Sequence, residues 1–379
     1  MDRDIIKYKI RRRKEKLRKL LEHDQHLAER LKKVRNFSAK IRVSEYHLTN
    51  ACNLRCQGCW FFEFDFDKNT KENSSLESLK QLLLSEQRRG INTALIIGGE
   101  PTLFPDRIDI FIQQMRHVTI STNGLKAFPY EGFEEVAVAV SLFSGGKHDD
   151  ELRAIKPNGK RFSGLFDTAL SNYKNDSRAI FIYAVTEESV PYIEETVRKI
   201  HENGNQVNFN YYCSYDKPEN LLKPASQQLL DKLLEVQSNY PDTVLSHPYY
   251  LKTMVTGESH WGEFGYAVCP SISVDHPDNQ ERINNGNPYL PRFNTYAADY
   301  ESLNLCCTSG KCTGCRDSQA VLSWLLVNFE EFLSSKELLT TWVEIAELYW
   351  RQFYWSPYHY TKKGLSDTQY ANTIGKVSG

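Results

Sequence analysis

Between residues 43 and 240 the chain alternates short apolar runs with longer stretches in which apolar residues recur every three or four positions. The short runs predict buried strands, and the longer stretches predict amphipathic helices. This alternation favours an α/β fold, with a parallel sheet and its helices outside. The predicted strands are 43–48, 93–97, 117–122, 136–142, 179–185 and 207–212, and the predicted helices are 74–89, 105–116, 164–173, 191–203 and 226–238.

Six strand–helix units are fewer than the eight of a closed barrel, so we expect a partial (β/α)6 barrel of the TIM type, open on one side. Leucine and valine at helical spacing predict a helical, basic N-terminal extension. After residue 240 the alternation breaks, and two further helices are expected at 318–334 and 336–354. The four expected parts are the extension (1–42), the barrel (43–240), a Cys-rich segment (241–334) and an aromatic-rich helical tail (335–379) that packs over the barrel.

The nine cysteines are clustered. Neither a secretory leader at the N-terminus nor a spanning apolar run of about 18 residues is present in the sequence, so we expect a cytoplasmic protein. Thiols stay reduced in that compartment, and clustered cysteines there indicate metal or redox chemistry before disulfides.

Cys52, Cys56 and Cys59 follow the first predicted strand with the spacing C-x3-C-x2-C. Three thiolates on one loop can hold three corners of a cubane iron–sulfur cluster. No fourth cysteine follows at this spacing, so one iron would keep an open position for a substrate or cofactor, as in an open zinc site. Two alternatives remain from spacing alone: a zinc site with its fourth ligand elsewhere, and three unrelated core cysteines.

Further motifs follow the next three predicted strands. They are Gly98-Gly99-Glu100-Pro101, then Ser121-Thr122-Asn123-Gly124, and then Ser141 with His148, Asp149 and Arg153 downstream. Barrel active sites lie at the face where the strands end. Taken in order with the cysteine loop, these motifs resemble the radical S-adenosylmethionine (radical SAM) superfamily, over residues 43–240.

The resemblance implies that Cys52, Cys56 and Cys59 hold a [4Fe–4S] cluster whose open iron chelates the amino and carboxylate groups of S-adenosylmethionine. One-electron reduction, by a donor such as flavodoxin or ferredoxin, would then release a 5′-deoxyadenosyl radical that abstracts hydrogen from an unactivated C–H bond. Many members have an aromatic residue before the third cysteine, whereas here Gly58 stands there and Trp60 follows. The implied contacts to S-adenosylmethionine are Gly98, Gly99, Glu100, Ser121, Asn123, Ser141, Arg153 and Trp60.

A second cysteine group comprises Cys306, Cys307, Cys312 and Cys315, with Cys269 upstream. Such a group can hold zinc or a second iron–sulfur cluster. A Cys-rich segment after the barrel resembles the SPASM and twitch extensions, and its five cysteines suit one auxiliary [4Fe–4S] cluster. The expected ligands are Cys269, Cys312, Cys315 and one of Cys306 and Cys307, with a structural zinc knuckle as the alternative. Cys213 is expected to be a small buried apolar residue.

Charge adds one asymmetry to this reading. The net charge of −1 divides into +10 over residues 1–42 and −11 over the rest. A basic run at 11–14 can contact phosphates, but no nucleic-acid-binding motif accompanies it, so we expect a solvated helix face packed on its own domain. The aromatic and acidic residues 61–67 either form a wall of the active site or an exposed strand edge.

The sequence therefore predicts a radical SAM enzyme, an oxidoreductase acting on a small metabolite or biosynthetic intermediate. A peptide-modifying maturase is the alternative within the class. A zinc-binding protein that binds nucleic acid through its basic arm is the alternative from another class, and it gives the ordered glycine and asparagine motifs no role.

Overall fold

The computed structural model describes residues 3–212, 225–265, 268–308 and 315–353, and these form an α/β fold around one mostly parallel sheet. Eight strands lie in the order β10-β9-β1-β2-β3-β4-β5-β6. Strands β1 to β6 all run in the same direction, and β9 runs parallel to β1. The six barrel strands are β1 (Val43–His47), β2 (Thr93–Ile97), β3 (His117–Thr122), β4 (Val136–Leu142), β5 (Ala179–Val185) and β6 (Gln206–Tyr211).

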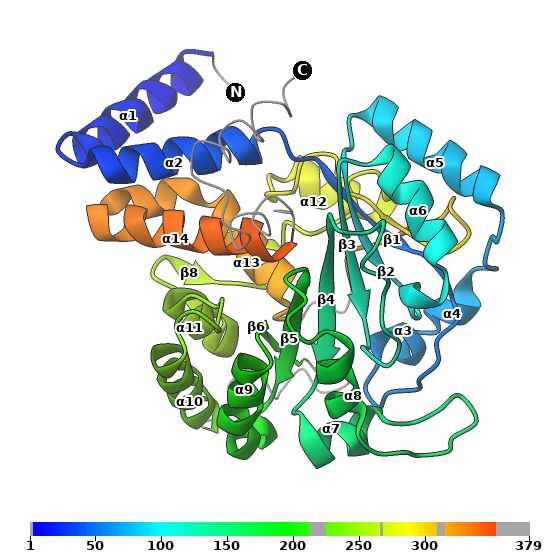
Figure 1. Ribbon diagram of the computed structural model, residues 1–379. Helices are drawn as coiled ribbons and strands as arrows, with labels where there is room; N and C mark the ends of the chain where they lie inside the picture. The colour runs from blue at the N-terminus through cyan, green and yellow to red at the C-terminus, as the bar shows by residue number, and fades with distance from the viewer. Residues whose placement is uncertain (1–2, 213–224, 266–267, 309–314, 354–379) are drawn as a thin grey trace.

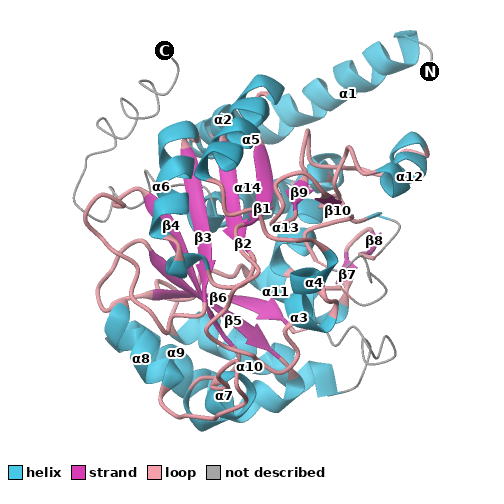
Figure 2. Cartoon of the chain, turned by 90° about the vertical axis from the view of Figure 1, so that its right-hand side faces the viewer, coloured by secondary structure: helices cyan, strands magenta, loops and turns pink. Residues whose placement is uncertain are grey.

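The sheet curves, because β5 and β6 turn away from the direction of β1 to β4 (Figure 2). Helices cover its outer face, with α5 and α6 beside the first strands and α8, α9 and α10 beside the last ones (Figure 1). This is the predicted partial barrel. Its helices are α3 (Trp60–Glu63), α4 (Phe66–Asn69), α5 (Leu76–Arg89), α6 (Pro105–Gln114), α7 (Gly146–Arg153), α8 (Leu165–Asn172), α9 (Ile193–Glu202) and α10 (Ala225–Asn239).

The predicted elements agree with the structure where the pattern is strongest. Strands β2 to β5 have the predicted bounds, and β6 begins and ends one residue earlier than expected. The reason is that parallel strands buried on both faces read as continuous apolar runs. Helix α7 was not predicted, because its sequence GKHDDELR is almost wholly polar. The segment 61–67 forms the short helices α3 and α4, so the strand-edge alternative for it was wrong.

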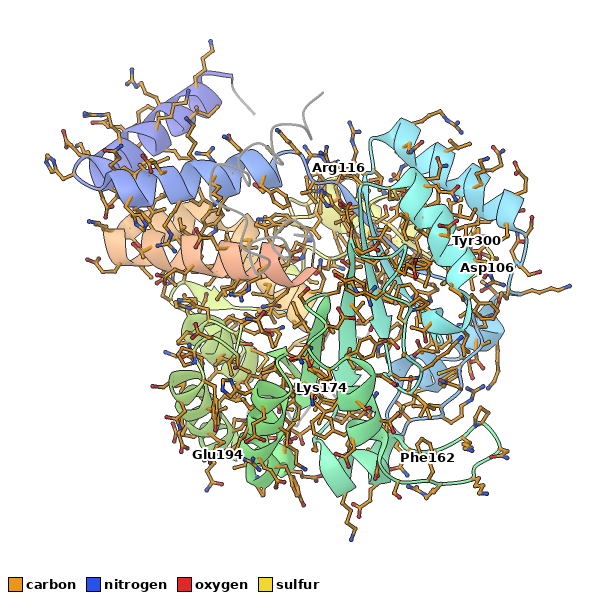
Figure 3. The ribbon with its side chains drawn as sticks, viewed as in Figure 1. Asp106, Arg116, Phe162, Lys174, Glu194 and Tyr300 are labelled. Atoms are coloured by element: carbon orange, nitrogen blue, oxygen red, sulfur yellow. The ribbon has the colours of Figure 1, made fainter. Side chains whose placement is uncertain are left out.

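The segment after residue 240 is more ordered than its sequence suggests. It contains α11 (Pro248–Thr256), α12 (Gln280–Asn284) and the short strands β7 (Glu258–Ser259), β8 (Gly262–Glu263), β9 (Thr295–Tyr296) and β10 (Leu303–Asn304). Strand β9 pairs with β1 and so continues the barrel sheet past its first strand. Beyond it, Tyr300 donates a hydrogen bond to the backbone oxygen of Leu48 over 3.5 Å and lies beside Asp106 of α6 (Figure 3).

A buried carboxylate joins this segment to the barrel. Glu86 of α5 accepts hydrogen bonds from the hydroxyls of Tyr46 on β1, at 3.0 Å, and Tyr296 on β9, at 2.8 Å. The two tyrosine rings stack, with their centroids 5.5 Å apart and their planes at 8°. Arg89 closes the network, since it pairs with Glu86 and with Asp275 of the C-terminal segment.

The basic N-terminal extension forms two helices, α1 (Arg3–Leu21) and α2 (Gln25–Ser38). The helical spacing seen in the sequence is interrupted because Asp24 caps α2 through a hydrogen bond from the backbone N–H of Leu27. Arg30 of α2 forms a two-point ion pair with Glu347 of α14 (Lys336–Phe353), at 3.1 and 2.7 Å. The extension therefore packs on its own chain, as expected.

The tail helix α14 packs on α2 and on α13 (Ser318–Val327), which is followed by the 3-10 helix Phe329–Ser334. Phe37 of α2 contacts both Trp350 of α14 and His117 at the start of β3. The described part of the tail thus lies where the barrel strands begin (Figure 1). None of the described helices has the length and apolar character needed to cross a membrane.

We predict that Glu86→Ala lowers the free energy of unfolding by about 3–5 kcal/mol, because it removes the acceptor of two buried tyrosine hydroxyls and one of the two acidic partners of Arg89. Urea denaturation followed by circular dichroism measures this loss. Glu77→Ala, on the exposed face of the same helix, is the matched control and should change the free energy by less than about 0.5 kcal/mol. Equal losses in the two variants would contradict the role assigned to Glu86.

Candidate functional site

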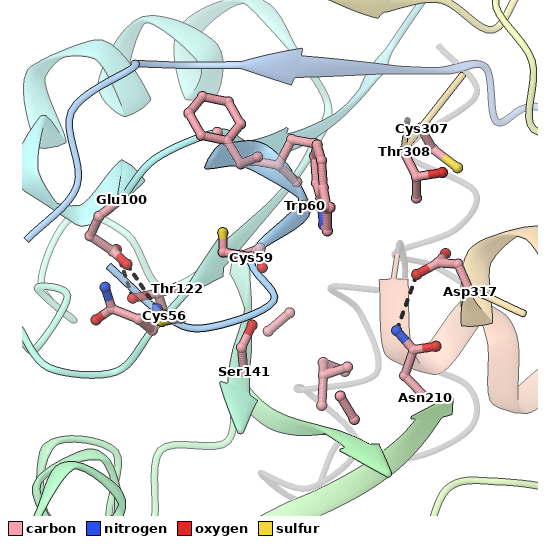
Figure 4. Close-up of a pocket in the computed structure, with 18 of the residues that line it drawn as sticks. Cys56, Cys59, Trp60, Glu100, Thr122, Ser141, Asn210, Cys307, Thr308 and Asp317 are labelled. Carbon is pink, nitrogen blue, oxygen red and sulfur yellow. Dashed lines mark hydrogen bonds between the residues drawn. The ribbon is translucent and has the colours of Figure 1, made fainter. Parts of the chain in front are cut away.

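The barrel strands end around a cavity of about 310 Å³. Ligand pockets are commonly about 300–1,000 Å³, so this space suits a small molecule. Residues from the cysteine loop, from the ends of the strands and from the C-terminal segment line it, with two groups of polar side chains on opposite sides (Figure 4). The lining includes all three cysteines of the first cluster, Trp60, Gly98, Gly99, Glu100, Ser121, Asn123, Ser141, Arg153 and Cys307.

The loop after β1 presents Cys52, Cys56 and Cys59 to this cavity. Its backbone is held by the segment that ends α7, through hydrogen bonds from the N–H groups of residues 55 and 57 to the oxygens of residues 155 and 152, both 2.7 Å. Burial raises the pKa of the Cys52 thiol to about 12 and that of Cys59 to about 11, and the proximity of the thiols to one another adds to the shift. A bound cation such as iron would offset this cost, since a coordinating thiol loses its proton.

The loop after β2 packs directly on the cysteine loop. The N–H groups of Gly99 and Glu100 donate to the backbone oxygens of Thr49 and Ala51, both over 2.8 Å. A Cβ atom at position 99 would lie 2.0 Å from the Ala51 oxygen. The contact therefore requires glycine at position 99, and it sets the distance between the cysteine loop and the loop after β2.

The Glu100 carboxylate is buried and accepts four hydrogen bonds. Two come from Thr102, at 3.1 Å from its N–H and 2.6 Å from its hydroxyl. The others come from the Thr122 hydroxyl at 2.7 Å and the Asn123 N–H at 2.8 Å. Glu100 thus ties the loop after β2 to the loop after β3.

Asn123 and Arg153 both touch the cysteine loop. The Asn123 side-chain amide lies 2.7 Å from the Asn53 side-chain oxygen and 3.9 Å from the Cys52 sulfur. Arg153 is buried, with its guanidinium 3.2 Å from both Asp149 oxygens and 3.3 Å from the Asn123 backbone oxygen. The Cys56 thiol lies 3.8 Å from the Arg153 backbone oxygen. Such groups can orient and tune a cysteine-held cluster.

Trp60 begins helix α3 and lines the cavity, with its ring 5.8 Å from that of His47 and 5.4 Å from that of Phe66.

Sequence reasoning missed Tyr212, at the end of β6. Gly58 has a left-handed φ of 69°, and a Cβ atom there would lie 1.5 Å from the Tyr212 hydroxyl oxygen. That hydroxyl donates to the Gly58 backbone oxygen over 3.0 Å.

A second polar group faces the cavity from the C-terminal side, and the sequence did not single it out. Asn210 at the end of β6 donates to Asp317 over 3.1 Å and accepts from the Ser318 N–H over 2.8 Å. Asp317 also caps α13 by accepting from the Gln319 N–H over 2.9 Å. Burial raises the pKa of the Asp317 carboxyl despite these bonds.

Glu45, on β1, is the other acid of this side. Burial, together with the proximity of Asp317 and Cys306, raises the pKa of its carboxyl well above the usual range. The sequence does contain a signal that could have identified Glu45. An acid in the middle of a buried parallel strand departs from the apolar run that such strands show.

The described cysteines of the second group are all buried. Cys306 lies near enough to Cys307 and Cys269 to raise the pKa of both thiols, with burial contributing to each. Cys307 lines the cavity and so adjoins the space that the first cluster loop faces. Cys312 and Cys213 lie outside the described residues. Within the described ranges, no three His, Cys, Asp or Glu side chains converge as the ligands of a single metal ion would.

A family model for the radical SAM superfamily matches residues 46–223. The chain is 29% identical over 129 residues to the GTP 3′,8-cyclase of Alkaliphilus oremlandii. This match covers 31% of this chain and 40% of that protein. It is 24% identical over 231 residues to molybdenum cofactor biosynthesis protein 1 of Bos taurus, covering 52% of this chain and 34% of that protein. The chain thus spans less than half the length of these relatives.

Among solved structures, native anSMEcpe with bound AdoMet has a TM-score of 0.48 and 14% sequence identity, and the match covers 71% of this chain and 78% of that one. SuiB of Streptococcus suis bound to S-adenosylmethionine has a TM-score of 0.41 and 18% identity, covering 56% of this chain and 52% of that one.

We predict that Gly99→Ala destabilises the protein by about 1–3 kcal/mol, because its methyl group must push the cysteine loop away. Urea denaturation measures the loss, and iron bound after anaerobic reconstitution reports whether the loop has moved. Gly265→Ala is the control, since a Cβ atom there meets nothing within 4 Å. A Gly99→Ala protein as stable as the control would show that the close contact is unimportant.

Proposed function

We propose that this chain, which belongs to the radical SAM superfamily and is an iron–sulfur enzyme of that class, reductively cleaves S-adenosylmethionine and abstracts hydrogen from its substrate. The observation that supports this proposal most directly is that three thiols from one loop face a cavity formed at the ends of parallel strands. The substrate is a small metabolite or biosynthetic intermediate with an unactivated C–H bond.

The donor set fits a [4Fe–4S] cluster held by Cys52, Cys56 and Cys59, because three thiols on a tight loop supply three of its four corners. Such a cluster, when bound and reduced, would supply the one electron that cleaves the S–C5′ bond of S-adenosylmethionine into methionine and a 5′-deoxyadenosyl radical, and that radical would take a hydrogen atom from the substrate. A flavodoxin or ferredoxin is the proposed electron donor.

The chain's own residues position the reactants and exclude water. Gly98 and Gly99, in the loop after β2, line the cavity, so they are proposed to contact the methionine part of S-adenosylmethionine. Ser121, Asn123, Ser141 and Trp60 also line the cavity and are proposed as further contacts. Glu100 and Arg153 are also proposed at this site, where their hydrogen bonds hold the loops that carry the other contacts.

A second [4Fe–4S] cluster is proposed at Cys269, Cys312, Cys315 and one of Cys306 and Cys307. In support, Cys306 lies close to both Cys269 and Cys307 in the buried interior, and Cys315 is buried as well. The proposed role is electron transfer or substrate contact at the wall of the cavity that Cys307 lines.

The partner of this reaction is S-adenosylmethionine together with a small molecule. Peptide modification remains the second candidate within the class. GTP is a candidate substrate because relatives named GTP 3′,8-cyclase match part of the chain, and it can be tested directly by product analysis. We propose a location in the cytoplasm.

We predict that replacing Cys52, Cys56 and Cys59 together by alanine abolishes the formation of 5′-deoxyadenosine under dithionite, because no site for the reducing cluster remains. Iron after anaerobic reconstitution should fall from about eight to about four atoms per chain. Cys213→Ala is the cysteine-to-alanine control and should keep both cleavage and iron. Cleavage by the triple variant, or stoichiometric zinc in place of iron in the wild type, would overturn the proposal.

We predict that the double variant Cys269→Ala/Cys315→Ala binds about four irons instead of about eight, because only the first cluster can assemble. Reductive cleavage of S-adenosylmethionine should persist, since the first three cysteines are unchanged. Iron analysis together with electron paramagnetic resonance of the reduced protein measures this. Unchanged iron content would exclude the second cluster at these residues.

A further inference from the structure

Glu45 is a buried carboxyl group whose environment offers little to stabilise its charge. It is the third residue of β1, only 5% exposed, and its side chain lines the cavity. Among the described residues, its side chain has one hydrogen-bond partner, the Thr295 hydroxyl on β9, at the long distance of 3.4 Å. Within the described part of the chain, no Lys, Arg or His forms an ion pair with it. Removing a carboxylate from water without a partner is strongly unfavourable.

The other described carboxyl groups of the cavity lining offer Glu45 no hydrogen bond. Asp317 is itself engaged with Asn210 and with the start of α13. The described cavity lining holds three carboxyl groups, Glu45, Glu100 and Asp317, but Arg153 is its one basic side chain.

Arg153 does not balance these acids, because both of its close contacts with carboxylate oxygens are to Asp149. Glu100 is satisfied by four donors of its own. Among the described carboxyl groups of the cavity lining, Glu45 is therefore the one with a single, long hydrogen bond.

We propose that Glu45 binds a cationic nitrogen, such as a primary ammonium group, of the substrate. This inference rests on the proposed function, because it places the substrate in the same cavity. An ammonium group has N–H donors for the Glu45 oxygens, and its charge favours the ionised form of that carboxyl group. A triphosphate in the same place would offer no such donors and would meet like charge.

The apolar residues beside Glu45 define the rest of the ligand. Leu95 pairs with Glu45 in the sheet register, and Ile97, Ile182 and Ala184 also line the cavity. A ligand with a cationic nitrogen on an aliphatic chain suits such a lining. The same chemistry occurs in a small amine and in the lysine side chain of a peptide.

The test uses the full-length chain, reconstituted anaerobically with iron and sulfide, in equilibrium dialysis against radiolabelled n-hexylamine at low ionic strength. We expect saturable binding to the wild type and binding at least about tenfold weaker to E45Q, because the variant keeps the shape but loses the charge. E45D keeps the charge and should bind within a few-fold of the wild type. E263Q, an acid replaced on the exposed strand β8, is the matched control.

Equal binding of n-hexylamine to wild type and E45Q, or binding to neither, overturns the proposal. The proposal is also overturned if GTP competes with n-hexylamine for the same site and the E45Q substitution leaves GTP binding unchanged. Circular dichroism confirms that each variant is folded, and E45M provides a second uncharged variant if E45Q is not. Competition by N-acetyl-lysine amide or by a lysine-containing tripeptide distinguishes a small amine from a peptide. Dialysis requires no cleavage of S-adenosylmethionine, so a failure of the proposed function appears separately, as the absence of 5′-deoxyadenosine.

Discussion

Six neighbouring strands run in one direction, and this shared direction places the loop after each strand at the same rim of the barrel. The loops carry exposed backbone groups that need hydrogen-bond partners. Buried side chains meet much of this need, because Glu100 joins the loops after β2 and β3, and Asp149 accepts from the backbone N–H of Phe143 after β4 over 2.6 Å. Asn210 does the same between β6 and α13. The cavity is thus shaped by polar contacts that leave its walls fixed.

Hydrophobic pattern was enough to predict strands β2 to β5 to the residue, because strands covered on both faces admit few polar positions. The motifs after the strands also indicated which residues meet at the rim. Strands β9 and β10 could not be predicted, since two residues give no periodicity, and the pairing of β9 with β1 joins segments some 250 residues apart. The placement of Tyr212 against Gly58 is likewise a contact between residues 154 positions apart.

The charge asymmetry of the sequence has a local explanation at each end. One base of the extension, Arg30, is paired with Glu347 of the tail helix α14, and a pair of the opposite sense, Asp24 with Lys336, also joins the extension to α14. Among the buried acids of the body, Glu86 and Glu100 each serve several donors. Glu45 differs from both, because it lies at the cavity with one weak donor. Burial alone would not have distinguished these three glutamates.

The contact between Tyr212 and Gly58 links two loops that a comparison of sequences treats as independent. The tyrosine hydroxyl occupies the volume that any side chain at position 58 would need. Among homologues, a bulky residue before the third cysteine should therefore accompany a small residue at the end of the sixth strand, and glycine should accompany tyrosine. A chimera that exchanges only the cysteine loop would combine two large groups in one place, so the two segments have to be transplanted together.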